Sequence, residues 1–408
     1  MVKRTWILLL VGTLLGGCGT ERERAVARDM LFLQTSSGVA IVEAGAGSAS
    51  YSGTAAVPSS DWSTVVQTTL VQEQRAPRST RIDAVNPATG RIQWERTLPG
   101  KLRVKVVSGD GNLVALADRR EPNYLSGRRH TRLLIVDGRT DITRTIEVAK
   151  NLEPEAFSTD GRSLFVLLYT PWNAPTNYQV RRLDLTTQRL MEVYTPDAHL
   201  QERMRGTARI QAMSPDGSRL YTLYTLGRGK NAHAFIHTLD LDELWAHCID
   251  LPHEFARANE FSTDISVSAD GEHLYVADSA AGAVAEIDTR QLAITETATV
   301  DFGRGYPTHV LSAEGGGLYL TSGRNLTSLD PATLLETRSR KMDQRITGVQ
   351  SGSGGRKLYV GLRKRIEVID PTDGSMLATL DPPGVGRLGL MGRGSRVLTN
   401  YQYLSCAC

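Results

Sequence analysis

The chain has 408 residues, of which 40% are hydrophobic and 22% are charged, and its formal net charge is +3. This is the composition of a globular protein with enough apolar residues to form a core. The small net charge and the lack of a basic block exclude a strongly cationic nucleic-acid-binding protein.

Residues 1–17 have the features of an export signal. Lys3 and Arg4 supply a positive start, and the apolar run from Trp6 to Leu15 has about half the length that spans a bilayer. The run ends in "LGGC", which resembles the lipobox of bacterial lipoproteins, so we expect cleavage before Cys18 and a lipid on its thiol. A plain secretory signal or a core strand are the alternatives.

Residues 18–29 follow as a charged tether, and this arrangement predicts a protein anchored to the bacterial cell envelope. Gly19, rather than Asp, favours the outer membrane if the cell has two membranes. Export implies an oxidising compartment, where a disulfide from Cys248 to Cys406 or Cys408 is one possibility. The alternatives are a soft-metal site in the Cys-Ala-Cys tail or, as we favour, a frayed end without a functional thiol.

A short pattern recurs along the rest of the chain, as in "FSTDGRSLFVLLY", "MSPDGSRLYTLYT" and "VSADGEHLYVAD". Ser and Asp side chains bond nearby backbone N–H groups and Gly accepts a positive φ, so each copy predicts a strand, a tight turn and a second strand. A second signature follows, a strand that ends in Asp or Asn. Its markers are Asn86, Asp137, Asp184, Asp240, Asp288, Asp330 and Asp370.

The markers are 40 to 56 residues apart, with a mean of about 47. Four short strands in each period predict an all-β fold, a β-propeller of four-stranded blades, and helical periodicity is nearly absent. "VDFGRGYPTHVLSAEGGGLYLTS" resembles the YVTN-type family of β-propellers, and the resemblance covers nearly all of the chain after the tether. The resemblance implies the propeller fold, and propellers of this kind include lactonases. "IDAVNPATGRIQWE" is similar to a quinoprotein repeat, but only this copy carries the Trp.

Seven complete copies extend from about residue 53 to 384, and 31–44 and 387–406 each have the pattern of two further strands. We therefore expect residues 30–408 to form a single, monomeric domain of eight blades, with a closing blade shared by the N- and C-terminal strands. Seven blades, the usual number in the YVTN-type family, is the alternative.

Strands alternate in direction within a blade, so the tight turns lie on one face and the longer, non-repeating loops on the other. Loops on a rigid scaffold concentrate binding residues, and Arg with flat aromatic rings suits acidic groups, sugars or protein surfaces. We expect this face to bind a protein or an anionic polymer, and a merely solvated surface is the alternative. The candidate residues are Arg128, Arg129, Trp172, Tyr178, Arg203, Arg228 and Lys230.

The innermost strands line a central channel, where polar residues could bind a small ligand or serve a hydrolytic enzyme. The channel candidates are Arg103, Lys105, Glu155, Arg209, Asp264, His309, Arg345 and Arg387. We find no nucleophile elbow, phosphate-binding loop or metal-ligand spacing, so we expect no metal and no cofactor. The favoured function is a non-catalytic, lipid-anchored envelope protein; a lactonase-like hydrolase, or a quinoprotein- or amine-dehydrogenase-like enzyme, is the alternative.

Overall fold

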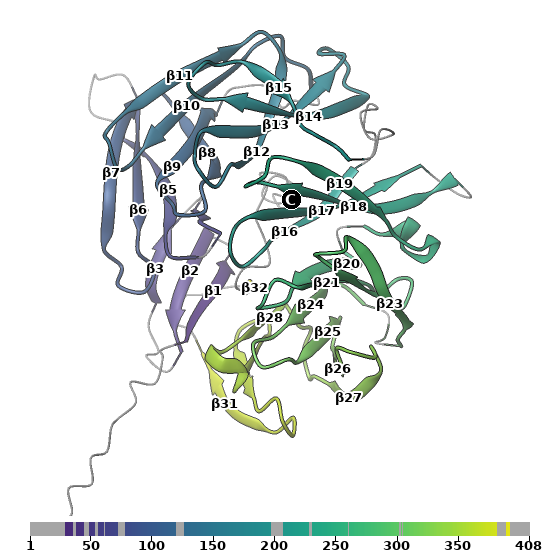
Figure 1. Cartoon of the computed structure of the whole chain (residues 1–408). Coiled ribbons are helices and arrows are strands. Elements are labelled where there is room, and N and C mark those ends of the chain that lie inside the picture. The colour runs from purple at the N-terminus through teal and green to yellow at the C-terminus, as the bar shows by residue number, and fades with distance from the viewer. Residues whose placement is uncertain are drawn as a thin grey trace, which may run out of the picture.

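A computed structural model of the chain describes residues 29–35, 38–44, 49–53, 56–60, 62–71, 78–119, 126–196, 207–227, 231–259, 261–301, 303, 305–381 and 389–391. Every strand in these ranges belongs to one of eight four-stranded antiparallel sheets, which fan out around a common centre (Figure 1). The eight-bladed propeller predicted from the repeats is therefore confirmed.

Blades 1 to 4 each begin at the innermost strand and proceed outward along the chain. Their strands are β4 (Val57–Pro58), β5 (Val65–Val71), β6 (Ser79–Val85) and β7 (Ile92–Pro99); β8 (Leu102–Val107), β9 (Leu113–Asp118), β10 (Thr131–Asp137) and β11 (Thr143–Val148); β12 (Asn151–Phe157), β13 (Ser163–Thr170), β14 (Asn177–Asp184) and β15 (Leu190–Glu192); β16 (Thr207–Met213), β17 (Arg219–Leu226), β18 (His233–Asp240) and β19 (Ala246–Asp250).

Blades 5 to 7 repeat this order, and two short 3-10 helices interrupt it. Their elements are η4 (His253–Arg257), β20 (Thr263–Val267), β21 (His273–Asp278), β22 (Ala283–Asp288) and β23 (Ala293–Thr299); β24 (Thr308–Ser312), β25 (Leu318–Ser322), β26 (Asn325–Leu329) and β27 (Glu336–Lys341); β28 (Gly348–Ser351), η5 (Ser353–Gly355), β29 (Leu358–Gly361), β30 (Ile366–Ile369) and β31 (Met376–Leu380). Among the described residues, no helix has the length and apolar character needed to cross a membrane.

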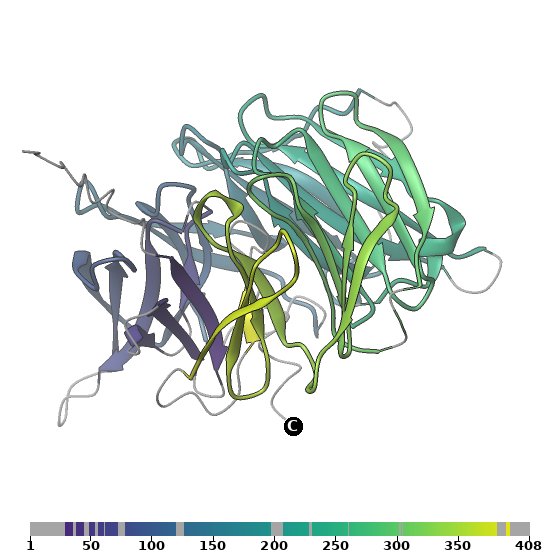
Figure 2. The same ribbon diagram turned by 90° about the horizontal axis from the view of Figure 1, so that it is seen from below.

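The eighth blade closes the ring with strands from both ends of the chain. Its innermost strand is β32 (Gly389–Met391), and β1 (Met30–Thr35), β2 (Gly38–Glu43) and β3 (Ala49–Gly53) follow outward. The shared closing blade is confirmed, but it takes one described strand from the C-terminal side and three from the N-terminal side, rather than two from each. Figures 1 and 2 show β1–β3 beside blade 7.

Side chains secure this closure on the flank that faces blade 7. The Tyr359 hydroxyl donates to Asp29 Oδ2 at 2.7 Å, and the Ser353 backbone N–H donates to Asp29 Oδ1 at 2.7 Å. Gln350 Nε2 donates to the Met30 carbonyl at 2.6 Å. Because the closing pair β1–β32 is short, these bonds help to hold the eighth blade against blade 7.

The repeated turns take the form that their sequence predicts. In blade 2 the Ser108 hydroxyl donates to Asp110 Oδ1 at 2.6 Å, and the Leu113 N–H donates to Ser108 Oγ at 2.9 Å. Gly111 has a φ of 74°, the left-handed region that a side chain would strain. Blades 3, 4 and 5 repeat these bonds around Asp160, Asp216 and Asp270.

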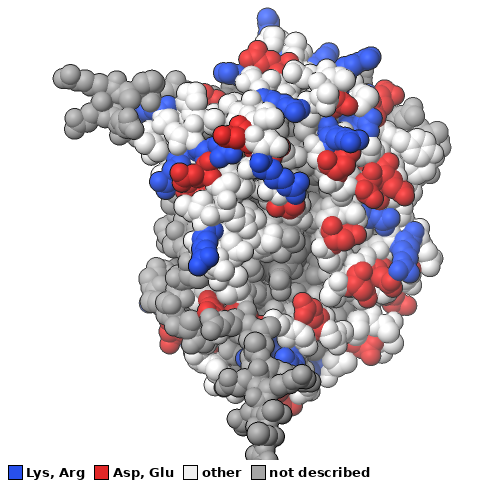
Figure 3. Space-filling view, turned by 60° about the vertical axis from the view of Figure 1, so that its left-hand side comes forward, with Lys and Arg blue, Asp and Glu red and all other residues white. Residues whose placement is uncertain are grey.

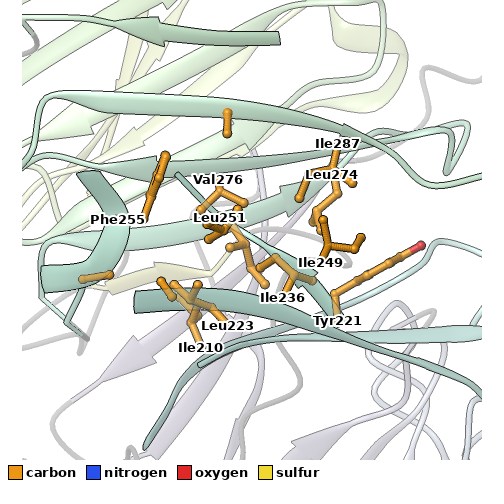
Figure 4. Packing of buried hydrophobic residues seen from close by; sticks show 14 of the residues in the cluster. Ile210, Tyr221, Leu223, Ile236, Ile249, Leu251, Phe255, Leu274, Val276 and Ile287 are labelled. Carbon is orange, nitrogen blue, oxygen red and sulfur yellow. The ribbon is translucent and has the colours of Figure 1, made fainter. Parts of the chain in front are cut away.

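The hydrophobic core lies between neighbouring blades. Figure 4 shows one such layer, where Tyr221 and Ile249 of blade 4 lie in the same buried cluster as Leu274 and Ile287 of blade 5. Phe255 from η4 closes this layer. Each fully buried side chain of this size stabilises the fold by about 1.5–3 kcal/mol. Blade-to-blade packing therefore makes a rigid ring on which loops and channel residues are held.

Candidate functional site

The two ends of the ring differ in the connections that they carry. We call the end with the turns between the first and second and between the third and fourth strands of each blade the turn face, and the opposite end the loop face. The loop face holds the connection between β9 and β10, which includes Arg128 and Arg129, and the connection between β13 and β14, which includes Trp172. These two connections approach each other, since the Arg128 N–H donates to the Trp172 carbonyl at 3.1 Å.

Arg128 lies in the interior, although the sequence predicts it on the binding surface. Its side chain is 5% exposed and reaches the first strand of blade 3. Its Nε donates to Asn151 Oδ1 at 3.0 Å, its Nη2 pairs with Glu153 Oε2 at 2.8 Å, and its Nη2 also donates to the Leu152 carbonyl. A guanidinium held by so many acceptors anchors its loop and is not available to a partner.

Tyr178 is also buried, at 5% exposure, and this too differs from the expected surface position. Its ring stacks on Tyr224 with centroids 5.6 Å apart, and the Tyr169 ring of the neighbouring strand β13 lies 5.8 Å away. These rings belong to the packing between blades 3 and 4. The alternation of β14 decides this, because Tyr178 falls on the side of the strand that faces the neighbouring blade.

Arg129 and Trp172 do lie on the surface of the loop face. Trp172 is 41% exposed, and the Arg129 guanidinium lies over its ring at 4.6 Å from the centroid. Arg203, Arg228 and Lys230 fall outside the described residues, as does Cys18. Of the predicted binding residues, the structure thus describes two on the surface, as a single stacked pair.

Two further exposed aromatic side chains lie on the loop face, and sequence reasoning did not single them out. Phe261 is 57% exposed and Tyr306 is 47% exposed, just before the innermost strands of blades 5 and 6. Their segments are adjacent, since the Thr308 N–H donates to the Phe261 carbonyl at 3.0 Å. On the side of the molecule that Figure 3 views, basic and acidic side chains are interspersed.

The channel holds a second set of polar groups. Two of them are directed inward by β-bulges in the innermost strands β8 and β12. In β8 the pairing with β9 skips Lys105, and in β12 the pairing with β13 skips Glu155. Such bulges re-aim a side chain. Each bulged residue lies three positions before its turn serine, Ser108 or Ser158, so Lys105 and Glu155 are at equivalent depths in adjacent blades.

Lys105 belongs to a buried network of charges. Its Nζ lies 2.5 Å from Glu153 Oε1, and Glu153 also pairs with Arg128, so one carboxylate joins two cations. Burial lowers the pKa of Lys105, and Arg103 lowers it further by charge repulsion, while Glu153 opposes both. This network links the buried side chain of Arg128, which comes from the loop face, to Lys105 in the channel.

Glu155 remains partly accessible to solvent, and Gln211 Nε2 donates to its Oε2 at 2.7 Å. Desolvation by the surrounding protein raises the pKa of Glu155 to about 8, and the nearby Glu153 contributes to the rise. Gln211 lies three residues before Ser214, the same offset as Lys105 and Glu155. That offset was the sequence signal that could have placed all three together.

Lys105 and Glu155 form the deep end of a cavity of about 490 Å³ at the turn-face end of the channel. Val106, Phe157 and Met213 give it apolar walls, and the turns of blades 1 to 4 form its rim. The sequence predicts tight turns on this face and the binding residues on the loop face. The repeated turns are structural, but four of them together enclose a cavity that no single repeat reveals.

The other channel candidates do not join this cavity. Asp264 Oδ2 lies 3.8 Å from His309 Nδ1 and accepts the Val310 N–H at 3.1 Å, so this pair links blades 5 and 6. Arg345 is exposed in the connection before β28, outside the innermost strand. Arg103 is half-buried, the Arg209 side chain is not among those described, and Arg387 lies outside the described residues.

One group of metal-ligand types comes together within the described ranges, on the turn face of blade 5. Atoms of Asp270, Glu272 and His273 lie within 4.8 Å of one another. Each side chain already has a partner: Ser268 donates to Asp270, Arg290 pairs with Glu272, and Glu286 lies 2.7 Å from His273 Nδ1. We draw no metal assignment from it.

No protein-family model matches the sequence, and no curated protein matches it either. Solved structures share the fold. Dihydro-heme d1 dehydrogenase NirN in complex with DHE is 14% identical with a TM-score of 0.54, over 89% of this chain and 74% of that one. Apo AztD from Citrobacter koseri is 13% identical with a TM-score of 0.54, over 89% and 96%. At this identity the likeness establishes architecture alone, and this chain is an eight-bladed β-propeller.

Proposed function

We propose that this chain is a lipid-anchored, non-catalytic β-propeller of the YVTN type that binds a protein or anionic polymer at the bacterial cell envelope. The observation that carries the proposal is the Arg129–Trp172 pair on the loop face. Arg and Trp are enriched among the residues that dominate binding energy at protein interfaces. A guanidinium stacked on an indole ring keeps its N–H donors free for a carboxylate or phosphate.

Two features of the fold support this use of the pair. Arg128 anchors the loop at its base through Asn151 and Glu153, so Arg129 begins from a fixed point. A pre-ordered side chain loses less conformational entropy on binding. Phe261 and Tyr306 add exposed aromatic surface to the same face. The loop face therefore offers a cationic anchor and aromatic contact area on a rigid ring.

Partner capture from a cell-envelope extract tests the proposal. We expect Arg129→Glu combined with Trp172→Ala to abolish capture, with unchanged thermal unfolding because both residues are exposed. Arg290→Glu is the matched control, because its exposed guanidinium lies on the turn face of blade 5. Equal capture by the double variant and the wild type would show that the loop-face pair does not bind the partner.

The anchor requires a separate test, since Cys18 carries it and lies outside the described residues. We expect Cys18→Ser to move the protein from the membrane fraction to the soluble fraction, because two acyl chains or one chain with a second signal hold a protein on a bilayer. Retention of the variant in the membrane fraction would contradict lipid anchoring.

A second candidate function, hydrolysis at the channel, is favoured by the presence of Lys105 and Glu155 in the lining of one cavity, with Gln211 hydrogen-bonded to Glu155 from outside that lining. A carboxylic acid with a pKa of about 8 can donate a proton near neutral pH, as general acid catalysis requires. This function predicts turnover of lactone substrates by the wild type and its loss in Glu155→Gln. An absence of turnover over a lactone panel would reject the catalytic function.

A further inference from the structure

The cavity at the turn-face end of the channel has charges of opposite sign at its two ends. Its deep end is built from the bulged Lys105 and Glu155, and its rim includes the turn residues Asp110, Asp160 and Asp216. In blades 2 and 3, about five residues of strand and turn separate the deep-end residue from the rim aspartate. At roughly 3.3 Å per strand residue, the three strand residues alone place the rim on the order of 10 Å from the deep end.

The deep end has a net positive charge near neutral pH. Arg103 and Arg128 do not line the cavity, but both lie near enough to Lys105 to lower its pKa by charge repulsion, and Glu153 balances one of these three cations. Glu155 adds little negative charge below its pKa of about 8. The Lys105 side chain is buried like that of Arg128, but unlike Arg128 it lines the cavity, and its ammonium uses one of three N–H donors on Glu153, so we assign the other donors to an incoming acceptor.

The rim has a net negative charge. Asp160 and Asp216 use Oδ1 to hold their turns, as the Ser158 and Ser214 hydroxyls donate to that atom. Partial burial raises their pKa, but these hydroxyl and backbone donors outweigh it and lower the pKa of both carboxyls below the usual value. Asp110 has the same turn and also pairs with Arg139. Asp216 Oδ2 also accepts from the Ser218 hydroxyl at 2.8 Å, and Asp160 Oδ2 lies 3.9 Å from Arg162 Nε. A carboxylate oxygen accepts more than one hydrogen bond, so both oxygens are charged acceptors at the mouth.

We propose that this cavity binds a small, extended zwitterion, with its anionic group on Lys105 at the deep end and its amine on Asp160 and Asp216 at the rim. A plain anion would have to pass the acidic rim, and a plain cation would meet the cationic deep end. A molecule with a carboxylate and an amine at opposite ends satisfies both. Between its ends, an aliphatic segment would contact the apolar walls formed by Val106, Phe157 and Met213.

Calorimetric titration of the full chain with 6-aminohexanoate tests this assignment against molecules that lack one feature. Hexanoate lacks the amine, hexylamine lacks the carboxylate, and glycine has both charges at a separation too small for both ends of the cavity. We expect 6-aminohexanoate to bind about tenfold or more tightly than each of the three, because a hydrogen bond to a charged group contributes at least that ratio.

Asp160→Asn with Asp216→Asn is the decisive variant. Asn Oδ1 can accept the same turn hydrogen bonds, so the blades should fold, while the charges at the mouth are lost. We expect this variant to bind 6-aminohexanoate about tenfold more weakly. Asp270→Asn is the matched control, since it alters the same turn in blade 5, outside the cavity, and should bind as the wild type does. Lys105→Met should weaken binding of 6-aminohexanoate and hexanoate alike.

Three results would overturn the proposal. Hexanoate that binds as tightly as 6-aminohexanoate would make the cavity a simple anion site, and equal binding by hexylamine would make it a cation site. No measurable binding of any probe at millimolar concentration would show that the cavity takes no ligand of this class. The partner-capture assay with the loop-face variant is independent of all three results, because its residues lie at the other end of the ring.

Discussion

Replacement of Glu155 by Gln should stabilise the protein at alkaline pH and leave it nearly unchanged at acid pH. In the folded state this carboxyl holds its proton up to a pKa of about 8, whereas the ordinary value is 4.5. Between those two values the native state binds one proton more than the unfolded state. The free energy of unfolding therefore falls as the pH rises from 4.5 to 8, and Gln removes that dependence.

The difference between the two pKa values corresponds to about 5 kcal/mol. This is an upper limit, because the cavity admits water to part of the Glu155 side chain. The amide that the substitution introduces has nearly the same shape as the carboxyl group and can still accept a hydrogen bond from Gln211 Nε2, so packing should change little. We expect the variant to match the wild type at pH 5 and to exceed it by several kcal/mol at pH 9.

Urea unfolding of both proteins across this pH range measures the effect. Glu296→Gln is the control, because it removes the same formal charge from an exposed position on the outermost strand β23. Stability curves of wild type and Glu155→Gln that run parallel from pH 5 to pH 9 would refute a desolvated Glu155, and a similar gain in Glu296→Gln would assign the effect to net charge.

Two further predictions concern polar side chains that join neighbouring segments. Arg128→Ala should destabilise the protein by about 3–5 kcal/mol in urea unfolding, because Glu153 loses one of its two buried cationic partners; a loss below about 1 kcal/mol would contradict the anchoring role. Asp29→Ala should cost about 1–3 kcal/mol, since the Tyr359 hydroxyl and the Ser353 N–H lose their acceptor. We also expect proteases to cleave this variant faster near its N-terminus. Unchanged cleavage would show that the closing blade does not depend on the hydrogen bonds of Asp29.

The local pattern of the sequence predicts the blades because each of them is made from short-range chemistry. Ser108, Asp110 and Gly111 define a turn through bonds among neighbours in the chain, and the same bonds recur in blades 3 to 5. The β-branched and aromatic runs on either side define strands. The period then limits the number of blades that can fill the length of the chain, and the leftover segments predict the closing blade.

The site could be predicted only in part, because it depends on which way individual side chains point. Arg128 and Arg129 are adjacent in a loop that is rich in Arg, yet one lies in the core and the other on the surface. Tyr178 is of a residue type that is common in binding sites, but its position on β14 places it in the packing between blades. Phe261 and Tyr306 lie outside the Arg-rich loops and carry no motif, so only their exposure marks them.

The sequence by itself determined the repeat, the turns and the closure of the ring, because these follow from interactions over a few residues and from the need to cover strand edges. Only the tertiary structure decided which polar residues meet. Lys105 and Glu155 are fifty residues apart, and bulges and blade packing direct them to one cavity, where Gln211 of the next blade donates a hydrogen bond to Glu155. Burial then changes their chemistry, since the pKa of Glu155 depends on desolvation by segments that are distant in the chain.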